Sequence, residues 1–245
     1  MFLVDSARLR GGGTVTVDGA EGRHAAVVRR IRPGETVELT DGEGRLARCV
    51  VAESSRDGLV CEVRSRHDVP PPSPRLTVVQ ALPKGERGEL AVELLTEVGV
   101  DAIVPWPAAR CVARWEGERG AKALRRWRTT AREASKQARR ARLPEVAEAA
   151  PTAEVARLLG AATLGVVLHE KGDRDIGAVQ PPAQGQIVLV VGPEGGIDDN
   201  ELAAFTAAGA VAVRMGPTVL RTSTAGAVAA GVLLSGTERW SSVSR

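Results

Sequence analysis

The pattern of apolar and polar positions predicts two strand–turn units in the last third of the chain. Residues 187–191 are all apolar and lead into a glycine loop at 192–196, and residues 198–200 offer candidate N-caps for a helix at 201–208. A second run at 211–215 leads into a Gly-Pro turn. Ligands bind at the carboxyl ends of strands in open α/β sheets, and glycine lets the main chain approach them. We therefore expect these two strands to lie side by side and their turns to bind a ligand.

Strand and helix patterns alternate from residue 76 onward, which is typical of a parallel sheet covered by helices. Gly99 ends the first helix of this region and Pro144 is expected to end the second. The expected strands are 76–81, 102–104 and 162–168, and the expected helices are 90–98, 122–142, 151–159 and about 222–235. The small residues of the last helix favour close packing against another element, which could belong to another subunit.

Residues 1–70 show short alternating strands instead, which predicts a small β-barrel-like domain. The expected strands are 14–17, 35–40, 45–52 and 59–63, with a hairpin turn at 41–44 and one helical candidate at 24–31. A proline-rich stretch at 71–75 is expected to be a stiff linker, so we predict domains at 1–70 and 76–245.

Composition indicates a chain with a substantial core and no strong overall charge. Of 245 residues 43% are hydrophobic, and 33 Lys and Arg against 30 Asp and Glu give a net charge of +3. A nucleic-acid surface must therefore be local. The 3 Cys and 3 His are scattered, which predicts no metal site and no disulfide framework. We expect a cytoplasmic protein that neither binds a metal nor enters a membrane.

Two basic clusters predict phosphate binding. Residues 122–142 form a helical pattern with nine basic residues and one acid, Glu133. Near the first helical candidate, four arginines lie within ten residues, at Arg23, Arg29, Arg30 and Arg32. This second cluster is equally compatible with a solvated surface. Aromatic residues make up only 2% of the chain, so arginines would replace aromatic side chains in contacts with RNA bases.

The glycine loop at 192–196 differs from the known phosphate-binding loops. It lacks both the Lys-Ser/Thr pair of a P-loop and the spacing of a dinucleotide fingerprint. It also carries Glu194, which would repel a polyphosphate. The loop is therefore better suited to a neutral or cationic ligand, although a turn without any ligand is the simpler alternative.

Five stretches in this order resemble the RsmE-type 16S rRNA uridine-N3 methyltransferases of the SPOUT superfamily. They are 81–85, 96–100, 133–137 with Arg139, 192–196, and 216–222. The resemblance covers most of 76–245 and is weaker in the N-terminal domain. It implies an α/β fold in which a PUA-like, RNA-binding β-barrel precedes a parallel-sheet SPOUT domain with a C-terminal trefoil knot.

The resemblance also implies S-adenosylmethionine as cofactor, a homodimer, and 16S rRNA, expected within the small ribosomal subunit, as substrate. The cofactor would contact the loops after 168, at 192–196 and at 215–222. The implied cofactor residues are Leu168, His169, Gly192, Glu194, Gly195, Gly196, Met215, Gly216, Leu220, Arg221, Thr222 and Ala225.

The implied reaction is direct methyl transfer to uracil N3, and it needs few side chains. Arg139 and Arg221 are candidates for the positive charge that favours the N3 anion, while Glu133 and Gln137 would orient the base or an arginine. No residue stands out as general base. The candidate RNA-binding residues are Arg23, Arg29, Arg30, Arg32, Lys84, Arg132, Lys136, Arg139 and Arg140.

The chain departs from the family pattern at three positions. Thr218 stands where arginine is common, Ser223 where glutamate is common, and Ala138 where glycine is usual. Two alternatives follow: a SPOUT methyltransferase for another RNA position, or a non-catalytic RNA-binding ribosome-assembly protein. A small-molecule methyltransferase is disfavoured by the charge of residues 122–142.

Overall fold

The computed structural model describes residues 1–241, and the chain folds as two compact units. The N-terminal unit comprises Met1–Pro71 and Ser135–Leu143. The C-terminal unit comprises Pro72–Ala134 and the chain from Pro144 onward. Within the described residues, no helix is both long enough and apolar enough to cross a membrane.

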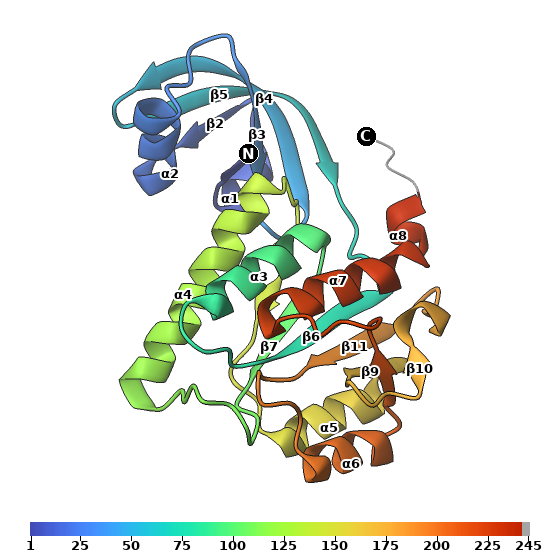
Figure 1. The fold of residues 1–245 in the computed structure, drawn as a ribbon. Coiled ribbons are helices and arrows are strands. Elements are labelled where there is room, and N and C mark those ends of the chain that lie inside the picture. The colour runs from blue at the N-terminus through green and yellow to red at the C-terminus, as the bar shows by residue number, and fades with distance from the viewer. Residues whose placement is uncertain (242–245) are drawn as a thin grey trace. The chain divides into compact units, whose positions relative to one another are not determined.

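The N-terminal unit is built on a curled five-stranded sheet with the order β1-β3-β4-β5-β2 (Figure 1). Its strands are β1 (Phe2–Leu3), β2 (Thr14–Val17), β3 (Thr36–Thr40), β4 (Arg45–Ser55) and β5 (Gly58–Asp68). All pairs are antiparallel except β1 with β3. Register shifts after Arg48 and after Val51 mark irregularities between β4 and β5, and such bulges bend a sheet.

The helical candidate of this unit differs from its prediction. After α1 (Ser6–Leu9), a short helix α2 (Gly19–Arg23) continues directly into a π-helix, η1 (His24–Val28). The Arg29 amide donates to the His24 carbonyl at 2.9 Å, five residues back, so the turn is wider than an α-turn. The apolar residues of this segment therefore do not share one buried face: Ala25 is buried, whereas Val27 and Val28 are 52% and 67% exposed.

A segment far along the chain, Ser135–Leu143, belongs to the N-terminal unit, which the sequence pattern does not predict. Thr40 Oγ1 donates to the Ala141 carbonyl at 3.0 Å, and the Leu143 amide donates to the Gly42 carbonyl at 2.9 Å. The predicted hairpin turn at 41–44 is therefore also the docking point of this segment. Gly44 has φ +112°, and a Cβ there would lie 2.6 Å from the Val69 carbonyl oxygen.

The three cysteines are buried free thiols, two in the N-terminal core and Cys111 in the C-terminal unit. Burial raises the pKa of each thiol, and that of Cys61 to about 11. Since the thiolate is the reactive form, we expect all three to resist a thiol reagent at pH 8 in the native protein and to react in denaturant. Rapid modification of the native protein, measured with a chromogenic disulfide, would contradict this.

The C-terminal unit is built on seven parallel strands in the order β10-β12-β9-β11-β6-β7-β8, which confirms the predicted parallel sheet. The strands are β6 (Arg75–Ala81), β7 (Ala102–Trp106), β8 (Glu145–Val146), β9 (Leu164–Leu168), β10 (Arg174–Asp175), β11 (Gln186–Val191) and β12 (Val211–Arg214). All residues of 187–191 are buried, as expected of a strand covered on both faces. The knotted threading stays a prediction.

Helices cover both faces of this sheet (Figure 1). Helices α3 (Arg87–Val98) and α7 (Thr222–Ser235) pack together on one face, while α5 (Thr152–Ala161) and α6 (Asp199–Ala207) pack together on the other. The remaining helices are α4 (Gly117–Gln137), η2 (Ile176–Ala178) and α8 (Glu238–Ser241). Gly99 caps α3 with φ +101°, as its position after the apolar face predicts.

Helix α4 ends earlier than predicted. Its last helical residue is Gln137, not a residue next to Pro144. Arg139 has φ +54°, and the Arg140 amide donates to the Ser135 carbonyl at 2.9 Å, five residues back. This arrangement is a Schellman cap, so a left-handed residue ends the helix before the proline does.

Candidate cofactor and active site

Three neighbouring parallel strands carry the loops of the candidate site. Strand β9 lies between β11 and β12 and pairs with both, so the prediction that β11 and β12 lie side by side is wrong. The carboxyl ends of all three lie at one edge of the sheet. The loops after 168, 191 and 214 therefore leave the sheet from adjacent positions, and the middle loop is the one after β9.

The loop after β9 is held against the end of β12. The His169 amide donates to the Val213 carbonyl at 2.9 Å, and the Gly172 amide donates to the His169 carbonyl at 3.0 Å. A Cβ on Gly172 would lie 2.6 Å from the Val213 carbonyl carbon, so only glycine fits this approach. The Lys171 amide donates to His169 Nδ1 at 3.2 Å.

The glycine loop after β11 packs tightly on itself and on the segment after β7. A Cβ on Gly192 would lie 2.7 Å from Ile197 Cγ1, and one on Gly195 would lie 3.2 Å from Arg110 Cβ. Arg110 Nη1 donates to the Gly195 carbonyl, and its Nη2 pairs with Asp198, each at 3.4 Å. Packing alone therefore favours glycine at both positions, whatever the loop binds.

A buried carboxylate anchors this loop to its neighbours. Asp198, one of the three predicted candidate caps, caps α6 and also forms a capping box with Glu201. Glu201 is 6% exposed and its Oε1 accepts from the Ala109 amide at 2.9 Å and from Thr152 Oγ1 at 3.0 Å. Its Oε2 accepts from the Asp198 amide at 3.2 Å. Glu201 thus joins the glycine loop, α5 and the segment after β7.

Replacing Glu201 with alanine is expected to destabilise the C-terminal unit by about 3 kcal/mol, because it leaves buried donors without an acceptor. All four Trp (106, 115, 127 and 240) lie in this unit, so their fluorescence in a urea titration reports on it. Glu201→Gln, which keeps one acceptor oxygen, should be destabilised less. Equal midpoints and slopes for the alanine variant and the wild type would refute the anchoring role.

The turn after β12 is the most open of the three. Gly216 has φ +67°, and a Cβ there would meet no atom within 4 Å. Arg221 is the N-cap residue of α7, and among the described residues its exposed guanidinium makes no hydrogen bond or ion pair. Thr222 and Ser223 are buried. Ser223 stands where the family commonly has glutamate. Its burial explains this departure, because burying an unpaired glutamate carboxylate would cost folding free energy.

The start of α7 is fixed to the sheet through Gln80 on β6. Gln80 Nε2 donates to the Thr222 carbonyl at 3.3 Å and to the Ala81 carbonyl at 3.1 Å. A Cβ on Gly226 would lie 3.1 Å from Leu95 Cδ2 and 3.2 Å from Val191 Cγ2. The small residues of α7 therefore allow close packing within the unit, which places Arg221 firmly at the edge of the sheet.

A fourth loop, after β6, joins the same edge. The Lys84 amide donates to Glu194 Oε1 at 3.3 Å, which brings a predicted RNA-binding residue against a predicted cofactor residue. A cavity of about 670 Å³ lies beside them. Its walls include Arg87, Leu90 and Val112, none of which was predicted to be a site residue. Val112 has an apolar side chain that is 70% exposed. Only the folded structure shows that this side chain lines the cavity.

The other candidate residues divide between the two units. Arg132 and Glu133 belong to the C-terminal unit, whereas Lys136, Gln137, Arg139 and Arg140 belong to the N-terminal unit. Glu133 and Gln137 lie four residues apart on α4, as predicted. In the N-terminal unit, Arg23, Arg29, Arg30 and Arg32 are exposed on and after the helical segment. The roles assigned to all these residues stay predictions.

Comparison with known proteins identifies the class first. An RNA methyltransferase domain model matches residues 70–234, and an RNA methyltransferase PUA domain model matches residues 17–64. The parallel sheet with its loop-bearing edge and the separate curled sheet correspond to these two domains. The chain therefore belongs to the class of RNA methyltransferases.

The relatives narrow the class to one family. The chain is 55% identical to the ribosomal RNA small subunit methyltransferase E of Mycobacterium bovis over 98% of this chain and 93% of the relative. It is 28% identical to that of Bacillus subtilis, with 86% of each chain covered. The chain belongs to the ribosomal RNA small subunit methyltransferase E family.

Solved structures agree with this assignment. A methyltransferase from Legionella pneumophila, in complex with its cofactor SAM, superposes with a TM-score of 0.81 at 27% identity, covering 92% of this chain and 93% of the other. The ribosomal RNA small subunit methyltransferase E from Neisseria gonorrhoeae, bound to S-adenosyl methionine, gives a TM-score of 0.80 at 26% identity, with 96% of each chain covered.

Proposed function

We propose that this protein is an S-adenosylmethionine-dependent methyltransferase that methylates N3 of one uracil base in 16S ribosomal RNA. The observation that carries the proposal is the set of three adjacent strand-end loops in a chain of the ribosomal RNA small subunit methyltransferase E family. A site built at one edge of a parallel sheet from several loops is typical of cofactor binding in α/β proteins. Because its proposed substrate is ribosomal RNA, we also propose that the enzyme acts in the cytoplasm.

The residues at this edge fit S-adenosylmethionine. The ligand carries a sulfonium cation and no phosphate, and the edge offers main-chain groups at three loops together with the Glu194 carboxylate. The open space around Gly216 leaves room for a ligand beside the backbone. The residues that would hold it are Leu168, His169, Gly192, Glu194, Gly195, Gly196, Met215, Gly216, Leu220, Arg221, Thr222 and Ala225.

The chain's own residues would then align the base and favour its anion. The bound cofactor supplies an activated methyl group. Arg221, exposed at the N-terminus of α7, adds its charge to the positive end of the helix dipole and would stabilise the N3 anion of uracil. Arg139 is the second candidate cation, and Glu133 and Gln137 would orient the base. Since pairing hides N3 in a duplex, the target uridine must be unpaired or flipped.

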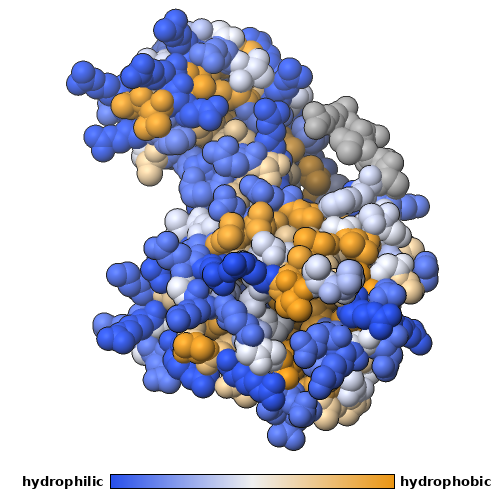
Figure 2. All heavy atoms as spheres, in the orientation of Figure 1, coloured by the Kyte–Doolittle hydropathy of each residue, from blue (hydrophilic) through white to orange (hydrophobic). Residues whose placement is uncertain are grey.

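An apolar face on the C-terminal unit supports a homodimer. Leu90 on α3, Val228 and Val232 on α7, and Trp240 on α8 are each at least 36% exposed. Figure 2 shows hydrophobic side chains gathered over α3 and α7. Exposed apolar patches of this kind mark interaction sites, and this one continues along a helix of small residues that permits close approach. A second copy of the chain is its proposed occupant.

Calorimetric titration with S-adenosylmethionine, followed by a methyl-transfer assay on 16S rRNA that lacks the modification, tests the function. We expect saturable binding and transfer of one methyl group to a uridine. Binding of RNA should weaken steeply with salt, because the basic residues displace counterions from phosphates. An absence of cofactor affinity would instead indicate a non-catalytic RNA-binding protein.

A further inference from the structure

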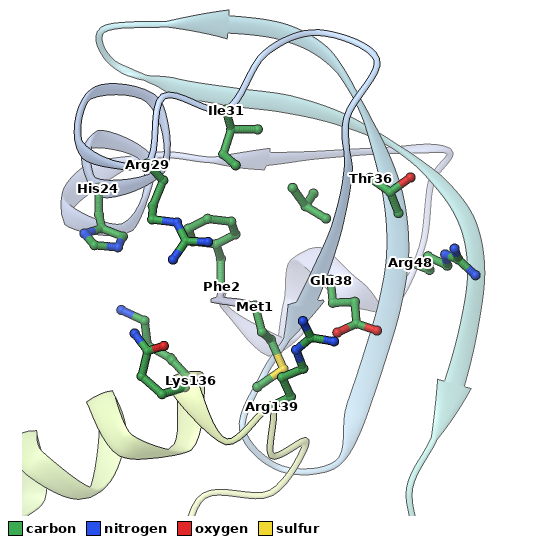
Figure 3. Close-up of a pocket in the computed structure, with 12 residues that line it drawn as sticks. Met1, Phe2, His24, Arg29, Ile31, Thr36, Glu38, Arg48, Lys136 and Arg139 are labelled. Atoms are coloured by element: carbon green, nitrogen blue, oxygen red, sulfur yellow. The ribbon is translucent and has the colours of Figure 1, made fainter. Parts of the chain in front are cut away.

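A basic cavity within the N-terminal unit is lined by residues of that unit alone, and by none of the residues proposed to bind the cofactor. It encloses about 410 Å³, a volume in the range of small-molecule sites. Arg29 enters it from the end of the π-helix, Lys136 and Arg139 enter from the end of α4, and Phe2 and Val37 come from the sheet. In Figure 3, Arg29, Lys136 and Arg139 point toward the same space from opposite sides.

The cavity is lined by several positively charged side chains, and two of them are free to bind an anion. Lys136 is engaged with Glu21 at 2.9 Å, with side chains only 8% and 14% exposed, and so holds its segment in place. Within residues 1–241, the guanidinium groups of Arg29 and Arg139 make no hydrogen bond or ion pair, and both residues are exposed. Glu38 is the one acid among the lining residues. An anion could therefore bind both arginines without displacing a partner.

The backbone at the cavity also departs from regular geometry. Arg30 and Arg139, both at φ +54°, are the two non-glycine residues with positive φ in the described chain. Arg139 occupies the left-handed position of a Schellman cap, where glycine is usual and a side chain is disfavoured. A π-helix, a feature frequent at functional sites, forms the opposite wall. Arg139 occupies a position where glycine would be more stable, which indicates that its side chain has a function in the cavity.

The rest of the lining suits the uncharged part of a nucleotide. Phe2 and Val37 are buried, and Ile31 is partly buried against the same core. The His24 ring meets Phe2 edge-on, with centroids 6.4 Å apart, and is itself partly exposed at the cavity. A base could rest on this surface while its phosphate lies between the two arginines. A cavity of this size accepts one nucleotide, not a duplex.

We propose that this cavity binds one unpaired nucleotide of the RNA substrate, with its phosphate held by Arg29 and Arg139 and its base against Phe2 and His24. The inference rests on the proposed function for the identity of the partner as RNA. It assigns Arg29 and Arg139 to a phosphate site in the N-terminal unit, in place of the catalytic charge that the family resemblance implied for Arg139. Proteins recognise RNA chiefly through such splayed, single-stranded nucleotides.

Fluorescence anisotropy with a labelled single-stranded RNA, and with the same RNA as a duplex, tests the proposal. Arg29→Ala and Arg139→Gly are each expected to weaken single-strand binding about tenfold and to lower the salt slope by about one. The preference for single strand over duplex should shrink with them. Arg64→Ala removes an exposed arginine of β5 that is paired with Glu62 outside the cavity, and should change affinity less than about twofold.

The variant Arg139→Gly distinguishes a loss of RNA binding from a loss of folding stability. Because glycine is the preferred residue at a left-handed cap, Arg139→Gly should unfold at the same urea concentration as the wild type or a higher one. Single-strand affinity within twofold of wild type for Arg29→Ala and Arg139→Gly overturns the proposal, as does an equal loss in Arg64→Ala. Binding of uridine monophosphate as tight as that of the RNA would assign the cavity to free nucleotides instead.

Failure of this inference and failure of the proposed function give different results. S-adenosylmethionine binding by the wild type, measured by calorimetry, depends on the C-terminal unit and tests the function. If the cofactor binds and the cavity variants keep full RNA affinity, only the cavity assignment is wrong. If the wild type has no cofactor affinity, the enzymatic function is wrong whatever the cavity binds.

Discussion

Arg221→Ala should lower methyl transfer by about 10²- to 10³-fold, the cost of removing one preorganised group that stabilises developing charge. Arg221 caps α7 through its main chain, whose carbonyl accepts from the amides of Thr224 and Ala225, each at 2.9 Å. Its exposed side chain is not needed for this cap. Loss of the guanidinium should therefore affect the reaction while the free energy of unfolding stays within about 0.5 kcal/mol of wild type.

The rate is measured with purified protein and 16S rRNA that lacks the modification, at saturating cofactor. Arg157→Ala is a matched control, because Arg157 is an exposed arginine on α5 with only a surface ion pair to Glu154. The control should retain the wild-type rate. Near wild-type transfer by Arg221→Ala would remove Arg221 from the mechanism.

Gly192→Val is expected to weaken S-adenosylmethionine binding at least tenfold. The new Cβ would lie 2.7 Å from Ile197 Cγ1, and Ile197 is only 3% exposed, so it has little room to move. Relief of the clash must shift the glycine loop, whose main chain is proposed to contact the cofactor. Overpacking of this kind costs about 1–3 kcal/mol in stability as well.

Calorimetry with the cofactor measures the effect, and Gly177→Val supplies the control. Gly177 lies in the same unit, and a Cβ there would meet no atom within 4 Å. The control should bind the cofactor as the wild type does. If Gly192→Val retained full affinity, the loop after β11 would not belong to the cofactor site.

Local patterns in the sequence predicted most of the C-terminal unit. The helix expected at about 222–235 spans those residues in the structure, and the apolar run at 187–191 lies within β11. These elements follow from rules that act over a few residues: apolar spacing, the Asp198 cap and the Gly99 stop. The fold class follows from the same alternation of strands and helices.

What the sequence did not predict depends on contacts between distant segments. The position of β9 between β11 and β12 is set by strand pairing, which leaves no local signal. The docking of Ser135–Leu143 on the hairpin turn depends on hydrogen bonds across about a hundred residues of chain, such as Thr40 with Ala141. The π-helix at 24–28 and the left-handed Arg139 likewise break the regular periodicity on which the helix predictions rest.

The sequence predicted some residues of the candidate site and missed others. The glycine loops and Arg221 are recognisable because their residue types are unusual at those positions. Glu201 is not, since a glutamate in the first turn of a helix is ordinary, and only its burial and its contacts with Ala109 and Thr152 reveal the anchor. The cavity beside Lys84 and the basic cavity of the N-terminal unit also arise only when separate segments meet.

Mass spectrometry of 16S rRNA from a strain that lacks this protein tests the proposed methylation of uracil N3 most directly. We predict that one N3-methyluridine is lost, that the wild-type protein restores it, and that Arg221→Ala restores little of it. An rRNA with every N3-methyluridine retained, and with a different methylated nucleotide missing or none, would contradict the proposed activity.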